Sequence, residues 1–277
     1  MALLEDGFSS QLQRLSKENL EKLLWAAATP VQEFGGKWLQ QGRWVSELDI
    51  LEMVRLANHE LQAFRETAWA MLSSDSTRQR FQRSTEEQKK VLRFFDSKWE
   101  DSRLYAREEF SKIFTQWTPE VLIGLCDSNY PDTRQFGMQM ITRCFQEPDG
   151  LEYLLKLSEH PSADLQTFAT NYLERYAGGN PERLKELTFY FKAILGQVNR
   201  SRVAKDRILS FLGNEAQKDE NAAQIVNELM SWLSATMAIK DKATAIDTLL
   251  QIHRQFPHLS VPLTIKPVPV RGTSHAV

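Results

Sequence analysis

The residues of this chain whose types could do chemistry are few and scattered. The sequence contains no Gly-x-Ser-x-Gly, Walker, Gly-x-Gly-x-x-Gly or His-Glu-x-x-His motif. The five histidines are spread over predicted loops and the tail: His59, His160, His253, His258 and His275. We therefore expect no catalytic residue, no cofactor and no small-molecule substrate, and predict that the chain is not an enzyme.

The two cysteines offer no metal site either. Cys126 and Cys144 form no Cys-x-x-Cys pair and have no neighbouring histidine cluster that could complete a zinc site. Both lie on apolar faces of predicted helices, so we favour buried small side chains over redox or metal roles. A reducing cytoplasmic compartment fits this cysteine usage best.

The charged residues nearly balance, with 34 Lys plus Arg against 36 Asp plus Glu and a formal net charge of -2. No bulk attraction to nucleic acid or anionic membranes is expected, so such a partner must be met by a local patch. One candidate patch is a basic cluster in the segment 198–207: Arg200, Arg202, Lys205 and Arg207. If this segment is helical, Arg200 and Arg207 fall near one face with Lys192, which could hold phosphates. We favour the alternative of a solvated helix face.

Aromatic residues suggest a second candidate surface. Six of the seven tryptophans fall in the first half of the chain, and Trp38, Trp44 and Trp99 lie at predicted helix ends or loops. Exposed Trp and Arg side chains are typical of interaction hot spots, which suggests an N-terminal binding surface. Burial in the core is the competing and commoner role of Trp on a helix.

The elements that must position these residues follow from an internal repeat. Five segments align without gaps: Val31-Gln32-Glu33-Phe34-Gly35, Leu61-Gln62-Ala63-Phe64-Arg65, Ser102-Arg103-Leu104-Tyr105-Ala106, Thr133-Arg134-Gln135-Phe136-Gly137 and Leu165-Gln166-Thr167-Phe168-Ala169. Their second column is always Gln or Arg and their fourth is always Phe or Tyr. Subtracting the aromatic positions 34, 64, 105, 136 and 168 gives spacings of 30, 41, 31 and 32 residues. Such spacings are typical of a repeated helix-turn-helix unit.

Local signals place helices within each unit. Each aligned segment opens a second helix, as shown by the apolar stripe Leu165, Phe168, Ala169, Tyr172, Leu173 and Tyr176. Asp149 with Glu152, and Ser84 with Glu87, predict capping boxes, whereas Thr118-Pro119 and Asn180-Pro181 predict capped helix starts. The polar stretch Ser73–Arg78 is predicted to be a loop inserted between two units. No long segment before residue 257 alternates with the period of a strand.

Because short helical pairs bury their apolar faces only by stacking, we predict an all-α fold. The Leu-rich first helices and the signature Asp132-Thr133-Arg134-Gln135-Phe136-Gly137 resemble HEAT repeats. This resemblance covers residues 12–177, and residues 151–262 also resemble helical regions of large bacterial proteins. It implies a right-handed α-solenoid of about five to seven hairpins over residues 1–256, with a divergent helical cap at 181–256.

The Gln/Arg column has two interpretations. Arg103 and Arg134 could form a row of donors for an acidic partner. In HEAT-like stacks, however, such residues typically bond to the Asp or the loop carbonyls of an adjacent unit, and we favour this ladder.

The C-terminal segment 257–277 has a different character. Pro257, Pro262, Pro267 and Pro269 exclude a helix, and Val261, Leu263 and Ile265 alternate as in an extended strand. The tail, extended or partly disordered, is expected either to add a strand to a partner or to pack across the last helices.

The resemblance implies a protein-binding scaffold or adaptor that belongs to a larger complex in the bacterial cytoplasm. A nucleic-acid-binding HEAT-like protein, including a DNA glycosylase-like enzyme, is the alternative, although no residue-by-residue match supports it. No apolar run has the length to span a membrane, and Met1–Ser10 contains Glu5 and Asp6, so neither secretion nor a membrane partner is expected.

Overall fold

The computed structural model describes residues 15–40, 47–114, 116–198 and 200–264. Within these ranges the chain is all-helical and contains no strand, which confirms the predicted all-α class. None of the described helices combines the length and the apolar composition that a membrane span requires. The chain forms two compact units, Met1–Cys144 (unit 1) and Phe145–Val277 (unit 2), each with its own core. The single continuous solenoid over residues 1–256 stays a prediction.

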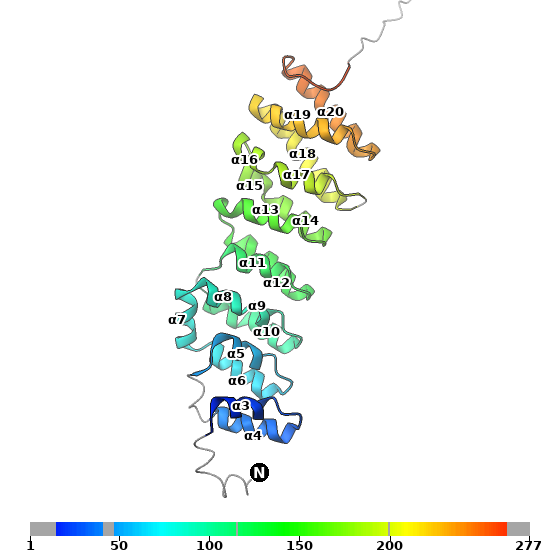
Figure 1. Cartoon of the computed structure of the whole chain (residues 1–277). Helices are drawn as coiled ribbons and strands as arrows, with labels where there is room; N and C mark the ends of the chain where they lie inside the picture. Colours follow the sequence, from blue (N-terminus) through cyan, green and yellow to red (C-terminus); the bar gives the residue numbers. More distant parts are fainter. Residues whose placement is uncertain (1–14, 41–46, 115, 199, 265–277) are drawn as a thin grey trace, which may run out of the picture. The chain divides into compact units, whose positions relative to one another are not determined.

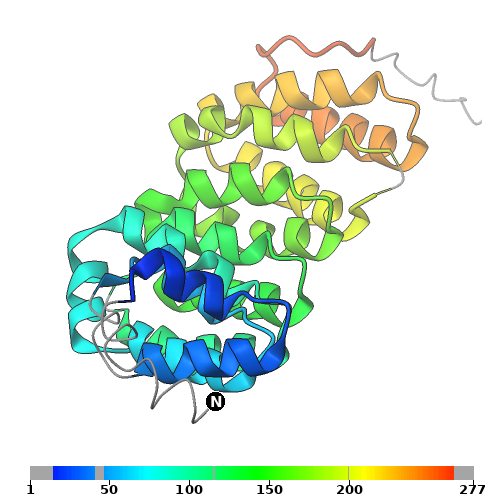
Figure 2. The same ribbon diagram turned by 60° about the horizontal axis from the view of Figure 1, so that its bottom comes forward.

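Unit 1 consists of helical hairpins in which a first helix packs against the following second helix. Its helices are α3 (Lys17–Leu24), α4 (Thr29–Gln40), α5 (Ile50–Leu56), α6 (Gln62–Leu72), α7 (Asp75–Arg83), α8 (Thr85–Lys90), α9 (Leu92–Phe95), α10 (Glu100–Glu108), η2 (Phe110–Ile113), α11 (Pro119–Cys126) and α12 (Pro131–Cys144). The packed pairs are α3/α4, α5/α6, α9/α10 and α11/α12. Figure 1 shows these pairs as successive layers of unit 1, and Figure 2 turns the α3/α4 pair toward the reader.

Unit 2 is also built of packed helices, and its last three helices are 15–17 residues long. Its elements are η3 (Glu147–Asp149), α13 (Gly150–Ser158), α14 (Ala163–Ala169), η4 (Thr170–Tyr172), α15 (Leu173–Ala177), α16 (Pro181–Glu186), α17 (Thr188–Leu195), α18 (Arg202–Lys218), α19 (Glu220–Ser234) and α20 (Ile239–Gln255). Helix α13 packs on α14 and α15, α17 packs on α18, and α19 packs on both α18 and α20. The predicted second helix at 165–176 is interrupted by η4, but its stripe is buried except for the half-buried Phe168.

The polar stretch Ser73–Arg78 is not a loop, so that prediction was wrong. Ser74 caps helix α7 by accepting a hydrogen bond from the Thr77 backbone N–H, and Asp75 stands in the first turn. Thr77 and Phe81, four residues apart, bury one face of α7. A strong N-cap and one buried face therefore suffice to make a helix of a very polar sequence.

The predicted caps divide into confirmed and wrong ones. Thr118 and Asn180 accept hydrogen bonds from backbone N–H groups three residues later, as predicted. Ser84 accepts from the Glu87 backbone N–H, but its own backbone N–H donates to the Arg80 carbonyl, so only half of the predicted capping box is formed. Asp149 makes no capping hydrogen bond, because it ends the 3-10 turn η3 and already has helical backbone angles. An N-cap side chain reaches the first turn only from an extended backbone conformation.

The fourth residue of each second helix organises the loop before it. Its side chain donates a hydrogen bond of 2.7–2.9 Å to the backbone carbonyl six residues earlier. The five donor–acceptor pairs are Gln32–Ala26, Arg65–His59, Arg103–Ser97, Arg134–Ser128 and Gln166–His160. In the second hairpin this residue is Arg65, whereas the sequence alignment placed Gln62 there. The second aligned segment was therefore displaced by three residues, nearly one helical turn.

The same displacement affects the aromatic column. Phe34, Tyr105, Phe136 and Phe168 are the sixth residues of their helices, but Phe64 is the third residue of α6. Phe64 instead packs against Gly36 of the preceding hairpin, where a Cβ atom would lie 2.1 Å from the Phe64 ring. Once the register is corrected, the seventh residues are all small and buried: Gly35, Ala68, Ala106, Gly137 and Ala169.

Residues 257–264, the described part of the tail, form neither helix nor strand. The Asn227 side-chain amide of α19 donates a hydrogen bond of 2.8 Å to the Ser260 carbonyl oxygen. This contact supports packing across the last helices for that stretch, whereas the predicted strand is absent from it. Ile265 and the rest of the tail lie outside the described residues.

Candidate functional site

The predicted ladder is formed in unit 1. The Arg103 guanidinium, besides bonding to the Ser97 carbonyl, donates to Asp132 of the next hairpin at 3.1 Å and covers the Tyr130 ring at 4.0 Å. Arg107 donates to the same carboxylate at 2.6 Å. Burial raises the pKa of Asp132, but the hydrogen bond from Arg103 and the charges of Arg107 and Arg103 lower it further, so the net pKa lies below its ordinary value.

The same contact recurs one hairpin earlier, where Arg65 pairs with Asp101 at 2.5 Å. Arg134 directs its guanidinium to the Ser128 carbonyl at 2.8 Å. The guanidinium groups of the Gln/Arg column are thus engaged within unit 1. Arg103 makes the predicted bond to the Asp of an adjacent hairpin, whereas Arg134 bonds to the loop of its own hairpin, and neither is a free donor.

The tryptophans of the predicted N-terminal surface are also engaged. Trp99 is half-buried, its indole N–H donates to the Asn58 carbonyl at 3.1 Å, and Arg65 and Lys98 lie over its ring at 4.6 and 4.9 Å. Trp38 is half-buried against Phe34 with a centroid distance of 6.4 Å. Trp44 lies outside the described residues.

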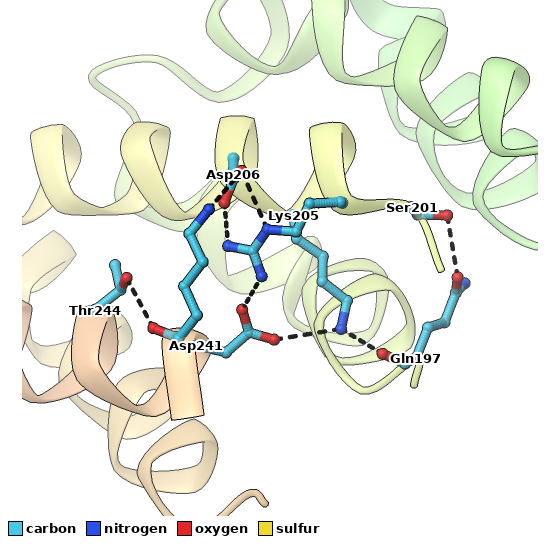
Figure 3. A network of polar contacts seen from close by, with 8 residues as sticks. Gln197, Ser201, Lys205, Asp206, Asp241 and Thr244 are labelled. Carbon is cyan, nitrogen blue, oxygen red and sulfur yellow. Dashed lines mark hydrogen bonds and ion pairs between the residues drawn. The ribbon is translucent and has the colours of Figure 1, made fainter. Parts of the chain in front are cut away.

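The basic cluster of unit 2 is held by carboxylates at the start of α18 and α20 (Figure 3). Arg202 donates to Asp241 at 2.5 Å and to Asp206 at 3.1 Å. Lys205, which is buried, lies 3.4 Å from Asp241 and donates to the Gln197 carbonyl. Lys205 is the fourth residue of α18, so the Lys205–Asp241 pair repeats in unit 2 the arrangement of Arg103 and Asp132.

The remaining two cations point to different places. Arg207 donates to Thr167, Thr170 and Asn171 on α14 and η4 at 2.8–3.2 Å. Arg200 precedes Ser201, which has a left-handed backbone φ of 54° and stands immediately before α18. Helix α18 begins at Arg202, so Arg200 lies outside it. The prediction that Arg200 and Arg207 share a helical face with Lys192 was therefore wrong. Arg200 is exposed.

Arg200 lies beside a cavity of about 720 Å³ between the loop that follows α17 and the loop that precedes α20. Its apolar lining comes from Leu195, Val198, Met237 and Ala238. Arg200, Arg202, Lys205 and Asp241 supply its charged groups. The cavity therefore combines an apolar wall with a cationic edge.

Large apolar side chains are exposed around this cavity. Val198 is 80% exposed, Met237 is 96% exposed, and Ile239, which follows the Ala238 wall, is 85% exposed. Of the eight large apolar side chains exposed in the described part of the chain, six belong to unit 2. Such a cluster beside a cavity is a feature of interaction sites, whereas single exposed apolar residues are common on any surface.

The local charge is positive although the whole chain is slightly acidic. Arg200 and the first five residues of α18 and α20 contribute five cations and two carboxylates, which sum to +3: Arg200, Arg202, Lys205, Lys240, Lys242, Asp206 and Asp241. Both helices start without a side-chain cap from their N-cap residues, Ser201 and Ala238. The positive ends of two 17-residue helices thus line the same cavity.

Sequence reasoning found the cations of this site but missed its apolar part. Val198, Met237 and Ile239 lie in or next to short inter-helix segments and belong to no sequence motif. One signal was available: the connection Ala235-Thr236-Met237-Ala238 has almost none of the polar turn residues that such loops normally carry. An apolar inter-helix connection that no helix can bury indicates a contact surface.

The described residues contain no cluster of three or more His, Cys, Asp or Glu side chains that could hold a metal ion. Cys126 is buried, and burial raises the pKa of its thiol to about 12, so the reactive thiolate is suppressed. Cys144 is half-buried, less than predicted. Comparisons of the sequence with protein-family models and curated proteins, and of the fold with solved structures, found no match.

Proposed function

We propose that this chain is a non-catalytic, protein-binding scaffold of HEAT-like hairpins, and that it contacts its partner at the cavity between the α17–α18 and α19–α20 connections. The supporting observation is the exposure of Val198 and Met237, which line this cavity, and of Ile239, which follows the lining residue Ala238 in the chain. Exposed apolar side chains next to a concave, partly cationic wall gain free energy when a partner covers them. The contacts of Asp241 with Arg202 and Lys205 join the starts of α18 and α20, next to the two loops.

A nucleic-acid-binding function has less support. Duplex or single-stranded binding needs several cations directed to phosphates. In the basic cluster, Arg202, Lys205 and Arg207 bond to groups of unit 2 itself, so only Arg200 presents its charge outward. A lone exposed arginine beside an apolar wall suits a protein surface better than a phosphate backbone.

The test is affinity capture from a lysate of the source cells with the wild-type chain and a Val198→Ser/Met237→Ser variant as baits. Both side chains are exposed, so their replacement leaves the core intact and removes apolar contact area only. We expect a partner protein captured by the wild type to be reduced about tenfold or more with the variant, because one or two buried apolar anchors are worth at least ~1.4 kcal/mol.

A Leu104→Ser/Phe189→Ser variant is the matched control, since both residues are exposed apolar side chains away from the cavity. This control should capture the partner as the wild type does. Equal capture by all three baits would reject the site, and capture of nucleic acid without protein would reject the scaffold function.

A further inference from the structure

The character of the cavity also restricts which partner segment fits it. Its walls are apolar at Leu195, Val198 and Met237, which suits an aliphatic or aromatic side chain. Its volume of about 720 Å³ is in the range of pockets that hold a few side chains or a small ligand. The first requirement on an occupant is therefore an apolar anchor residue.

The second requirement is set by charge. Asp241 is buried and paired with Arg202 and Lys205, and Asp206 is paired with Arg202 and Lys240. The two carboxylates are thus neutralised, while Arg200 and the uncapped starts of α18 and α20 add positive potential at the edge of the cavity. A carboxylate beside the anchor would meet complementary charge, and a lysine or arginine there would be repelled.

We propose that the occupant is a short segment of another protein in which an aliphatic or aromatic side chain enters the cavity and one or more neighbouring Asp or Glu side chains pair with Arg200. This inference rests on the proposed function and specifies the chemistry of the partner. Arg200 is then the residue that selects acidic segments, and Val198 and Met237 are the residues that provide most of the contact area.

The experiment is selection of a random peptide library displayed on phage against the full chain, followed by fluorescence anisotropy with the selected peptides. We expect enriched peptides to contain Asp or Glu next to Leu, Ile, Phe or Trp. Arg200→Glu should weaken binding of these peptides about tenfold or more, and the loss should shrink between about 0.1 M and about 1 M salt. Arg254→Glu, an equal charge change at an exposed site on the last turn of α20, should leave binding unchanged.

The outcomes separate the two proposals. If Val198→Ser/Met237→Ser abolishes peptide binding while Arg200→Glu has no effect, or if the selected peptides are basic or uncharged, the acidic-segment inference is wrong and the site remains. If the peptides bind equally to the Val198→Ser/Met237→Ser variant, the site itself is wrong. Tighter binding of a single-stranded oligonucleotide than of any peptide, lost in Arg200→Glu, would overturn both.

Discussion

At the scale of single residues, four of the five hairpin loops that the fourth residue of a second helix contacts are closed by two side chains that act on the backbone, and the loop at Ala26 is closed by Gln32 alone. The fourth residue of the second helix donates a side-chain hydrogen bond to the backbone carbonyl of a loop residue. The side chain of this loop residue in turn accepts a hydrogen bond from the backbone N–H two positions later. The accepting pairs are His59 with Leu61, Ser97 with Trp99, Ser128 with Tyr130 and His160 with Ser162. At His59 this fixes the tautomer, because Nδ1 accepts from Leu61 and Nε2 must therefore donate to the Leu24 carbonyl at 2.9 Å.

The ladder carboxylate Asp132 provides a test at this scale. Asp132→Asn should lower the free energy of unfolding by about 1–2 kcal/mol near neutral pH, because two charge-assisted hydrogen bonds from Arg103 and Arg107 are weakened at a partly exposed site. Urea unfolding followed by circular dichroism measures this loss. Glu108→Gln, which neutralises an exposed carboxylate on α10, should change stability far less.

The difference in unfolding free energy between wild type and Asp132→Asn should depend on pH, because the pKa of Asp132 is lowered in the folded chain. A carboxyl group whose pKa is lower in the folded chain than its ordinary value of 3.8 stabilises the fold above that value, and the contribution is lost as the pH falls through the folded pKa. The difference between wild type and Asp132→Asn should therefore be largest near neutral pH and shrink below about pH 4. A difference that is constant with pH would show that the ion pairs do not cause it.

At the scale of elements, a small residue at the seventh position lets each second helix approach the helix before it. A Cβ atom on Gly137 would lie 2.9 Å from the Cys126 backbone nitrogen, and one on Gly35 would lie 2.9 Å from the Leu23 Cβ. Backbone cannot move aside as a flexible side chain can. Close approach of the two helices is therefore a requirement of the hairpin and explains why this column accepts only Gly and Ala.

Gly137→Ala tests this requirement. We expect a loss of about 1–3 kcal/mol in the free energy of unfolding, since the added methyl group forces α11 and α12 apart. Gly213→Ala on α18 is the control, because its Cβ would meet nothing closer than the Thr248 hydroxyl at 4.0 Å. That change should stabilise the chain by up to about 1 kcal/mol through helix propensity. Equal effects of the two substitutions in thermal unfolding would contradict the close-approach account.

Most of the helices could be predicted from the sequence, and the error in the register of the second hairpin has an identifiable cause. Strong caps at Thr118 and Asn180 and long apolar stripes located helices correctly. The register error at Phe64 arose because the sixth residue of α6 is Thr67, and the aromatic residue one turn before it took its place in the alignment. Aromatic spacing alone therefore cannot distinguish the two registers. The seventh-position column of Gly and Ala distinguishes them, because only one register makes every member small.

At the scale of the whole molecule, the two units differ in what they expose. The cations of the Gln/Arg column in unit 1 are engaged in its ladder, and of its described large apolar residues only Leu51 and Leu104 are exposed. In unit 2, the exposed side chains of Val198 and Met237 line one cavity, and the exposed Ile239 follows its lining residue Ala238. The sequence indicated the cations of this site, but exposure of apolar side chains depends on which helices leave them uncovered. That information appears only when the hairpins are assembled.

Site-specific photo-crosslinking in the source cells tests the proposed site most directly. A photoreactive phenylalanine at position 237 lies at the cavity, and the same residue at position 189 occupies an exposed apolar position elsewhere in unit 2. We predict a discrete protein adduct from position 237 that is absent from position 189 and is reduced when Val198→Ser is added. Adducts of equal yield at both positions, or none at position 237 in cells that contain the full chain, would contradict the proposal.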